Sequence, residues 1–193
     1  MRKRIVVAVT GASGSIYGYR LLQKLRKKEN TQIHLVMSRA AERTSKLELD
    51  LLLKDWKSLS DYSYQIEDVG CRLASGSFRT DAMIVSPCSI HTLSAIAGGI
   101  SSNLILRAAD VCLKERRRLV LAVRESPFHL GHLRAMSAVT EMGAIVAPPI
   151  PGFYHKPQTV MDIVDHSIDR ILDLIGLPDP AALRWDDIAD GAE

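Results

Sequence analysis

At 193 residues, the chain is long enough for one domain with a sizeable buried core. Its 47% hydrophobic and 24% charged residues are typical of a soluble globular protein, and a net charge of +3 is too balanced to indicate a nucleic-acid or membrane surface. Cys71, Cys88 and Cys112 form no C-x-x-C pair, which argues against a disulfide framework or a thiolate zinc site. The basic N-terminus precedes an apolar run too short for a signal peptide, so we expect a cytoplasmic protein.

The first forty residues predict a strand–helix–strand unit. Residues 5–9 are a continuous run of β-branched and other apolar residues, which is typical of a strand buried on both faces. A glycine-containing loop then leads into a helix that ends near Lys28, and a second strand is predicted at 32–37. Crossovers of this kind give parallel sheets.

The alternation continues along the chain. Strands are predicted at 82–85, 118–123 and 144–146, and helices at 90–97, 103–116 and 130–142. A last helix begins at the capping box of Thr159 and Asp162 and ends before Gly176 and Pro178. Residues 47–78 give a less readable pattern, for which a partly helical structure is expected. The sequence predicts a single doubly wound α/β domain with a Rossmann- or flavodoxin-like parallel sheet, over residues 1–176, followed by a tail at 177–193.

In such sheets ligands bind beyond the carboxyl ends of the strands, which selects the loops at 10–14, 38–40, 86–92 and 124–128. The first reads Thr-Gly-Ala-Ser-Gly, where glycine permits close backbone approach and the free N–H groups of the following helix attract anions. A tight turn without a ligand is the alternative interpretation.

A second hydroxyl-rich loop, at 86–92, also opens a helix. Ser89 and Thr92 stand near its first turn, where hydroxyl and free N–H groups together can hold a phosphate. Simple N-capping of the helix is the alternative. Two such loops at one edge of the sheet favour a mononucleotide with a phosphate at one end.

The glycine loop is also common in NAD(P)-dependent dehydrogenases. Those enzymes need a Tyr-x-x-x-Lys pair, and no tyrosine of this chain is followed by lysine four positions later. The second predicted strand also lacks a terminal acidic residue for an NAD ribose. An NADP-dependent reductase that uses Arg39 remains open.

Several charged side chains are candidates for ligand binding. Arg107 and Lys114 are seven residues apart on one predicted helix and therefore share a face, as expected of groups that gather on an anion. Arg116–Arg118 are expected to form a solvated face. Arg124 and Glu125 end a hydrophobic strand, where charge is costly unless it is used for binding or held in a structural ion pair. The six histidines show no metal-binding spacing, so we predict no metal.

Taken together, these motifs resemble the UbiX/Pad family of flavoproteins. The resemblance runs nearly from end to end, and it is carried by the glycine loop, Pro87-Cys88-Ser89, the stretch at 107–117, Arg124-Glu125-Ser126-Pro127, the stretch at 151–157 and Arg184-Trp185. Family members are flavin prenyltransferases that join a dimethylallyl group to reduced FMN without a metal, and they work beside UbiD-type decarboxylases of aromatic acids, which receive the prenylated FMN.

The resemblance also implies roles for individual residues. It implies that FMN is bound by Gly11, Ala12, Ser13, Ser38, Ser89, Ile90, His91, Thr92 and Arg124. It implies that dimethylallyl phosphate is bound by Arg107, Lys114, Tyr154 and Arg170. The catalytic set would be Ser13, Glu48, Lys114, Glu125 and Trp185, the last of which lies in the tail. The site would lie between subunits of an obligate homo-oligomer, typically a dodecamer built from trimers.

Two further functions remain open beside the prenyltransferase and the NADP-dependent reductase. One is an FMN-dependent decarboxylase of the same fold that acts on a cysteine-containing peptide, for which His91 is the only histidine in a predicted flavin loop. The other is a non-catalytic flavin carrier. The sequence decides neither between a monophosphate and a diphosphate donor nor which decarboxylase is served.

Overall fold

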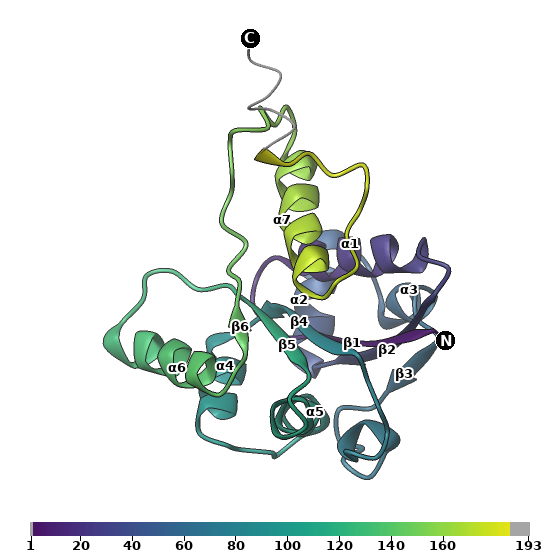
Figure 1. The fold of residues 1–193 in the computed structure, drawn as a ribbon, viewed down its shortest axis with the longest axis vertical. Coiled ribbons are helices and arrows are strands. Elements are labelled where there is room, and N and C mark those ends of the chain that lie inside the picture. Colours follow the sequence, from purple (N-terminus) through teal and green to yellow (C-terminus); the bar gives the residue numbers. More distant parts are fainter. Residues whose placement is uncertain (1, 186–193) are drawn as a thin grey trace.

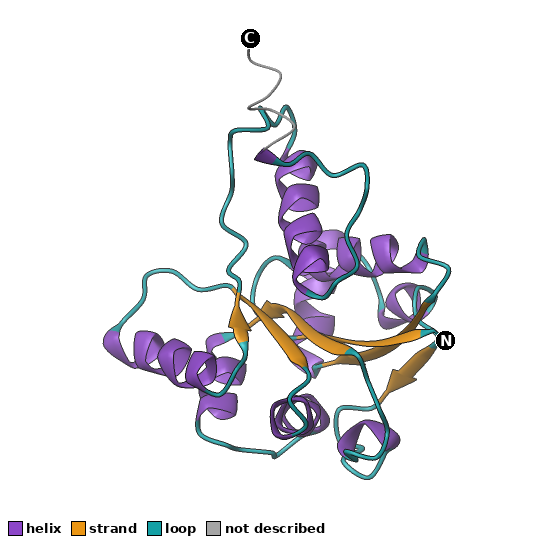
Figure 2. Cartoon of the chain, in the orientation of Figure 1, coloured by secondary structure: helices purple, strands orange, loops and turns teal. Residues whose placement is uncertain are grey.

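Six parallel strands form the centre of the protein in the computed structural model, which describes residues 2–185 (Figure 2). They are β1 (Lys3–Val9), β2 (Thr31–Met37), β3 (Tyr62–Tyr64), β4 (Ala82–Cys88), β5 (Arg118–Val123) and β6 (Ile145–Val146). Their order is β3-β2-β1-β4-β5-β6, and every neighbouring pair is parallel. The chain order reverses between β1 and β4, which confirms the predicted doubly wound fold and places its switch point between these two strands.

Helices cover both faces of the sheet (Figure 1). One face carries α1 (Ser15–Arg26), α2 (Arg39–Leu49), α3 (Leu53–Lys57) and α7 (Val160–Leu174). The other carries α4 (Ile90–Ala97), α5 (Leu104–Lys114), α6 (Leu130–Glu141) and the short 3₁₀ turn η1 (Arg72–Ala74). Ile5 and Val7 of β1 point to the α1 side and Val6 and Ala8 to the α5 side, all at 1% exposure or less. This two-sided burial explains why the strand is apolar at every position.

The sequence pattern missed α2 and β3 and did not locate α3 within the partly helical segment expected at 47–78, for a physical reason. Only Ala41 and Ser45 are buried on α2, so this helix has no apolar stripe, and β3 is a three-residue edge strand with two exposed residues. The predicted strand at 82–85 was also too short. β4 extends to Cys88, so Ser86 and Pro87 are buried strand residues and the ligand-facing loop begins at Ser89.

The segment between β6 and α7 leaves the sheet as an extended arm, and α7 returns from its end (Figure 1). Arg20 of α1 donates two hydrogen bonds of 2.8 Å to Asp165 of α7, and Lys24 donates one of 2.5 Å to Asp169, so α7 is fastened to α1. Within the described residues, no helix has both the length and the hydrophobicity to cross a bilayer.

Candidate functional site

Thr10 joins the two strands on either side of the switch point. Its hydroxyl donates a 2.7 Å hydrogen bond to the carbonyl of Pro87, and its oxygen accepts a 2.8 Å bond from the N–H of Ser89. Because Thr10 is only 2% exposed, these bonds fix the spacing of the β1 and β4 loops in a buried setting. Sequence reasoning treated Thr10 only as the start of a loop. A hydroxyl residue that directly follows a fully apolar strand is the signal that could have singled it out.

The glycine loop is closed by a carboxylate from α2. Gly14 adopts φ 100° as the N-cap of α1, and Glu48 accepts hydrogen bonds from the N–H groups of Gly14 (3.0 Å) and Ser15 (2.8 Å). Burial acts to raise the pKa of Glu48. Hydrogen bonds from the Ser13 hydroxyl and from these two N–H groups outweigh that effect and lower the pKa, so the carboxylate is ionised.

This contact corrects one expectation. The free N–H groups at the start of α1 were predicted to attract a bound anion, but those of Gly14 and Ser15 are taken by the protein's own carboxylate. Gly11 is required for packing, since a Cβ there would stand 2.4 Å from the Cβ of Ala40. An anionic ligand group is therefore better placed at the neighbouring loop.

That neighbouring loop begins α4. The Ser89 oxygen accepts from the N–H of Thr92 at 3.3 Å and lies 3.1 Å from the Thr92 hydroxyl, so the N-capping interpretation is confirmed. A capping hydroxyl still has a proton to donate. No hydrogen bond from the N–H groups of Ile90 or His91 occurs within residues 2–185, so the first turn of α4 offers free donors to an anion.

Two further residues reach the same edge of the sheet. Ser38 directly follows β2 and caps α2 by accepting from the N–H of Ala41 at 3.0 Å. Arg124 follows β5, and its N–H donates to the carbonyl of Cys88 at 3.0 Å, while its side chain is exposed. Glu125 accepts from the N–H of Ser126, and the described part of the chain shows no ion pair between Arg124 and Glu125. The residues matched to FMN therefore share one edge, with hydroxyl groups, free N–H groups and a cation that suit a phosphorylated flavin.

The cations of α5 lie on the other side of the molecule. Arg107 donates to Asp110 at 2.7 Å and to the carbonyl of Ala74 at 3.1 Å, and Lys114 contacts Glu115 at 2.5 Å. Both side chains are partly exposed, at 36% and 44%.

The expectation of a solvated face at Arg116–Arg118 is wrong for Arg117. Its side chain is only 12% exposed and donates to the carbonyls of Phe78 (3.0 Å) and Gly76 (2.5 Å). Arg117 is therefore a structural residue that holds the loop between η1 and β4.

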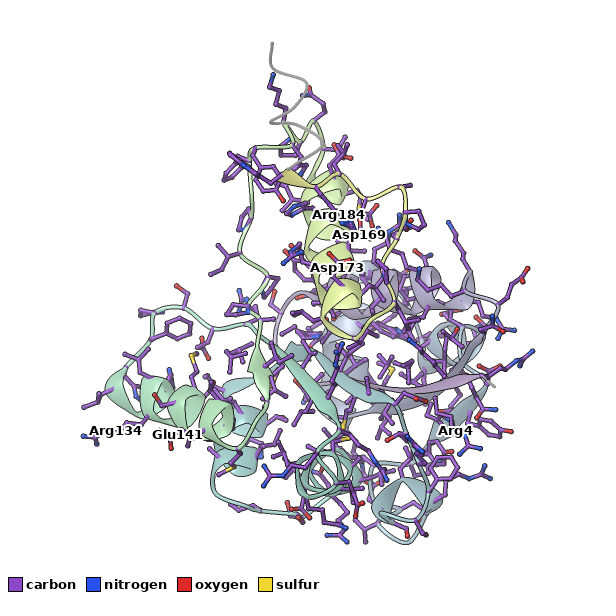
Figure 3. The ribbon with its side chains drawn as sticks, in the orientation of Figure 1. Arg4, Arg134, Glu141, Asp169, Asp173 and Arg184 are labelled. Atoms are coloured by element: carbon purple, nitrogen blue, oxygen red, sulfur yellow. The ribbon has the colours of Figure 1, made fainter. Side chains whose placement is uncertain are left out.

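Tyr154, Arg170 and Trp185 meet in a groove between the arm, α7 and the tail. The groove has a volume of about 480 Å³ and is also lined by His166, Asp169, Asp173, Ala182, Leu183 and Arg184. Asp173 accepts from Arg170 at 2.9 Å and from Arg184 at 2.8 Å. Figure 3 labels Asp173, Asp169 and Arg184 beside α7. The rings of Tyr154 and Trp185 pack edge to face with centroids 5.4 Å apart.

A single chain does not bring the four residues matched to the prenyl donor together. Arg107 and Lys114 belong to α5 on one face of the sheet, whereas Tyr154 and Arg170 belong to the arm and α7 on the other (Figure 1). Residues 2–185 contain no group of three or more His, Cys, Asp or Glu side chains that could hold a metal ion.

Comparison with known proteins agrees with this geometry. The flavoprotein family model matches residues 1–173. The flavin prenyltransferase UbiX of Escherichia coli K12 is 49% identical over 185 residues, which are 95% of this chain and 98% of the relative.

Two solved structures are similar as well. AnUbiX (PadA1), in complex with FMN and dimethylallyl pyrophosphate, is 49% identical with a TM-score of 0.93, over 96% of this chain and 98% of that one. A dodecameric FMN-dependent UbiX-like decarboxylase from Escherichia coli O157:H7 is 47% identical with a TM-score of 0.92, over 94% and 98%. From this agreement of sequence, fold and site, we conclude that the chain belongs to the flavoprotein family and, within it, to the UbiX flavin prenyltransferases.

Proposed function

We propose that this chain joins the dimethylallyl group of dimethylallyl phosphate to N5 and C6 of reduced FMN. The observation that carries the proposal is the edge of the sheet where hydroxyl groups, free N–H groups and the ionised Glu48 meet, in a chain about half identical to UbiX prenyltransferases. Incubation with reduced FMN and dimethylallyl phosphate should give a flavin heavier by one five-carbon unit. A flavin of unchanged mass would refute the proposal.

The flavin is oriented by groups at the switch point. Its phosphate would bind the first turn of α4, where Ser89, Ile90, His91 and Thr92 supply hydroxyl and N–H donors, rather than α1, whose first N–H groups already bind Glu48. Gly11, Ala12, Ser13 and Ser38 would line the remainder of the flavin site, and Arg124 would supply a positive charge beside it.

The prenyl donor would be held by Arg107, Lys114, Tyr154 and Arg170. Breaking an allylic C–O bond leaves charge on the phosphate, and cationic and hydroxyl donors stabilise that charge as it forms. The ring face of Trp185, which packs against Tyr154, would stabilise positive character on the allyl fragment. Reduced FMN supplies the nucleophile when it is bound.

Proton transfer would fall to the carboxylates. Ring closure would add one proton to the double bond of the attached prenyl group and remove one from C6. Glu48, which is ionised and hydrogen-bonded to the Ser13 hydroxyl, can accept the proton that C6 loses. Glu125, beside Arg124, would exchange a proton with the departing phosphate, and Ser13 would relay it. When Glu48 takes up the proton from C6, its hydrogen bonds from the N–H groups of Gly14 and Ser15 would weaken, so proton transfer would also affect the glycine loop.

The assembly of the donor site requires a second copy of the chain. Three observations support a homo-oligomer, built from trimers into a dodecamer: the four donor-binding residues lie on opposite faces of one chain, the arm carries exposed apolar side chains, and a relative of 47% identity is dodecameric. On the arm these side chains are Ile150 at 74% and Phe153 at 68%, and Val160 at the start of α7 is exposed at 75%. The prenylated FMN would pass to a UbiD-type decarboxylase.

A further inference from the structure

The hydroxyl of Tyr154 lies 2.6 Å from Nε2 of His166. Tyr154 belongs to the arm and His166 to the second turn of α7, so this bond connects the two walls of the groove. The ring of His155 stacks on that of His166 with centroids 4.3 Å apart and an interplanar angle of 11°. The ring of Trp185 also packs on Tyr154, with an interplanar angle of 76°. His166 is therefore held in one orientation toward the phenol oxygen.

The direction of this hydrogen bond decides what Tyr154 can offer to a ligand. A phenol has one proton to donate. If Tyr154 donates it to an unprotonated Nε2, no donor remains for an anion in the groove. If Nε2 carries a proton and donates to the phenol oxygen, the phenol O–H is free to point at the anion, and a chain of two bonds polarises the second.

We propose that His166 is a positioning residue that acts through Tyr154: its Nε2–H donates to the phenol oxygen and so directs the phenol O–H to the phosphate of the prenyl donor. The inference rests on the proposed function, and it assigns to His166 no bond to the donor or the flavin. No proton leaves either ring. The imidazolium form, which must donate from both nitrogens, enforces this arrangement, whereas the neutral form permits it in only one tautomer.

The surroundings of His166 set when the imidazolium forms. Burial is the largest cause that lowers its pKa, followed by the positive charges of His155 and Arg170, while Asp169 opposes them. The remaining charged groups that line the adjacent cavity are Lys24 of α1, Lys156 of the arm, Asp162 and Asp165 of α7, and Asp179 of the tail. In the free protein, burial and the neighbouring positive charges therefore favour the neutral form of His166. A bound phosphate dianion adds negative charge to the groove and favours protonation, so donor binding and protonation of His166 should support each other.

The test compares His166→Leu, which cannot donate, with His166→Gln, which keeps an N–H donor but does not titrate. Steady-state prenylation would be measured with dimethylallyl phosphate at saturating reduced FMN, from pH 5.5 to 8.5. His166→Leu should raise KM for dimethylallyl phosphate about tenfold and leave KM for FMN unchanged. His166→Gln should restore most of the affinity at pH 7.5. His132→Leu, on the distant α6, is the matched control and should behave as the wild type.

Two readouts separate this role from a merely structural one. The titration of the donor's own phosphate affects both proteins equally, so it cancels in the ratio of the wild-type KM to the His166→Gln KM. This ratio should decrease as the pH falls. In the Tyr154→Phe background, His166→Leu should cause no further loss. A His166→Leu variant with wild-type kinetics, equal losses with and without the Tyr154 hydroxyl, or a flat KM ratio would each overturn the inference.

If His166→Leu does not fold, the pH dependence of the Gln variant and its comparison in the Tyr154→Phe background still decide the matter. Failure of the wild type to prenylate FMN would overturn the proposed function and this inference together. Normal wild-type activity with unaffected variants would overturn only the role of His166.

Discussion

The carboxylate of Glu48, at the end of α2, accepts a 2.8 Å hydrogen bond from the backbone N–H of Ser15 at the start of α1. Gly14, the N-cap of α1, provides no side-chain cap of its own, so Glu48, 34 positions further along the chain, accepts from the N–H groups at the start of the helix. A negative charge at a helix N-terminus is also favoured by the helix dipole. Glu48 is thus both a structural cap and the carboxylate proposed to accept a proton during catalysis.

Glu48→Gln should separate these two roles. The amide keeps the size and an acceptor oxygen but loses the charge and the basicity, so we expect kcat to fall about 100-fold or more. The free energy of unfolding should fall by only about 1 kcal/mol, as for the loss of a helix cap. Rapid-mix kinetics and urea unfolding would measure both. Glu42→Gln, in the first turn of the same helix, is the control. Equal kcat values for the two variants would remove Glu48 from the chemistry.

Gly11→Ala should damage the cofactor site through packing. The new Cβ would stand 2.4 Å from the Cβ of Ala40, so the start of α2 or the glycine loop must move. We expect a loss of about 1–3 kcal/mol in unfolding free energy and at least a tenfold weaker affinity for FMN. Fluorescence titration with FMN checks the affinity. Gly70→Ala is the matched control, because the nearest atom to its Cβ is 3.8 Å away. Unchanged FMN binding by Gly11→Ala would show that the loop does not contact the flavin.

Asp173→Asn should loosen both guanidinium groups of the donor groove. The change removes the ion pairs to Arg170 and Arg184 while preserving the shape of the side chain. Since both arginines are partly exposed, we expect a modest rise of about three- to tenfold in KM for dimethylallyl phosphate, with KM for FMN unchanged. The effect should be smaller than that of Arg170→Ala, which would remove one of the groups proposed to bind the phosphate. A larger effect of Asp173→Asn would mean that Asp173 does more than orient the arginines.

The free energy of unfolding should fall in mild acid because the buried His34 resists protonation. It is fully buried on β2, where its ring contacts the Tyr64 hydroxyl at 2.9 Å. Burial, followed by the charges of Arg72 and Arg4, lowers its pKa to about 4 from a usual 6.5, with Asp61 opposing. The unfolded chain therefore takes up a proton below pH 6.5 that the folded chain refuses until about pH 4.

Stability that is fully present above pH 6.5 should consequently be lost as the pH falls toward 4, by at most about 3 kcal/mol. Urea unfolding at intervals between pH 7 and pH 4.5 measures the slope. In His34→Gln this contribution to the slope should vanish, whatever the absolute stability of the variant. Parallel curves for the two proteins would show that His34 titrates normally in the fold.

How much the sequence could predict depends on how each element buries its residues. β1 and β5 are apolar on both faces, and α5 and α7 carry clear apolar stripes, so their patterns are explicit. α2 buries two small residues, and Trp56 of the five-residue α3 is its only buried side chain, so neither shows a helical period. The loops that face the ligand could be predicted from the topology alone, since parallel strands bring their carboxyl ends to one edge of the sheet.

The site was less predictable because its contacts join distant segments. Spacing could place Arg107 and Lys114 on one face of a helix, but it could not show that this face lies opposite α7. Nor could it show that the Glu48 carboxylate accepts a hydrogen bond from the N–H of Gly14, or that the Arg117 side chain donates to backbone carbonyls. Only the family resemblance pointed to Glu48 and Trp185. The hydrogen bond between Tyr154 and His166 is apparent only in the folded structure, because neither spacing nor composition marks it.

The central claim is that cations from α5 of one copy and from α7 of another grip the same donor phosphate. Lys114→Ala and Arg170→Ala should each be nearly inactive alone. When the two variants are co-expressed with different affinity tags and purified as mixed oligomers, about one quarter of the sites should combine an intact Lys114 with an intact Arg170. Prenyl transfer to FMN should then recover to about one quarter of the wild-type rate. Mixed oligomers as inactive as either parent would contradict a site shared between copies, and with it the account given for the donor phosphate.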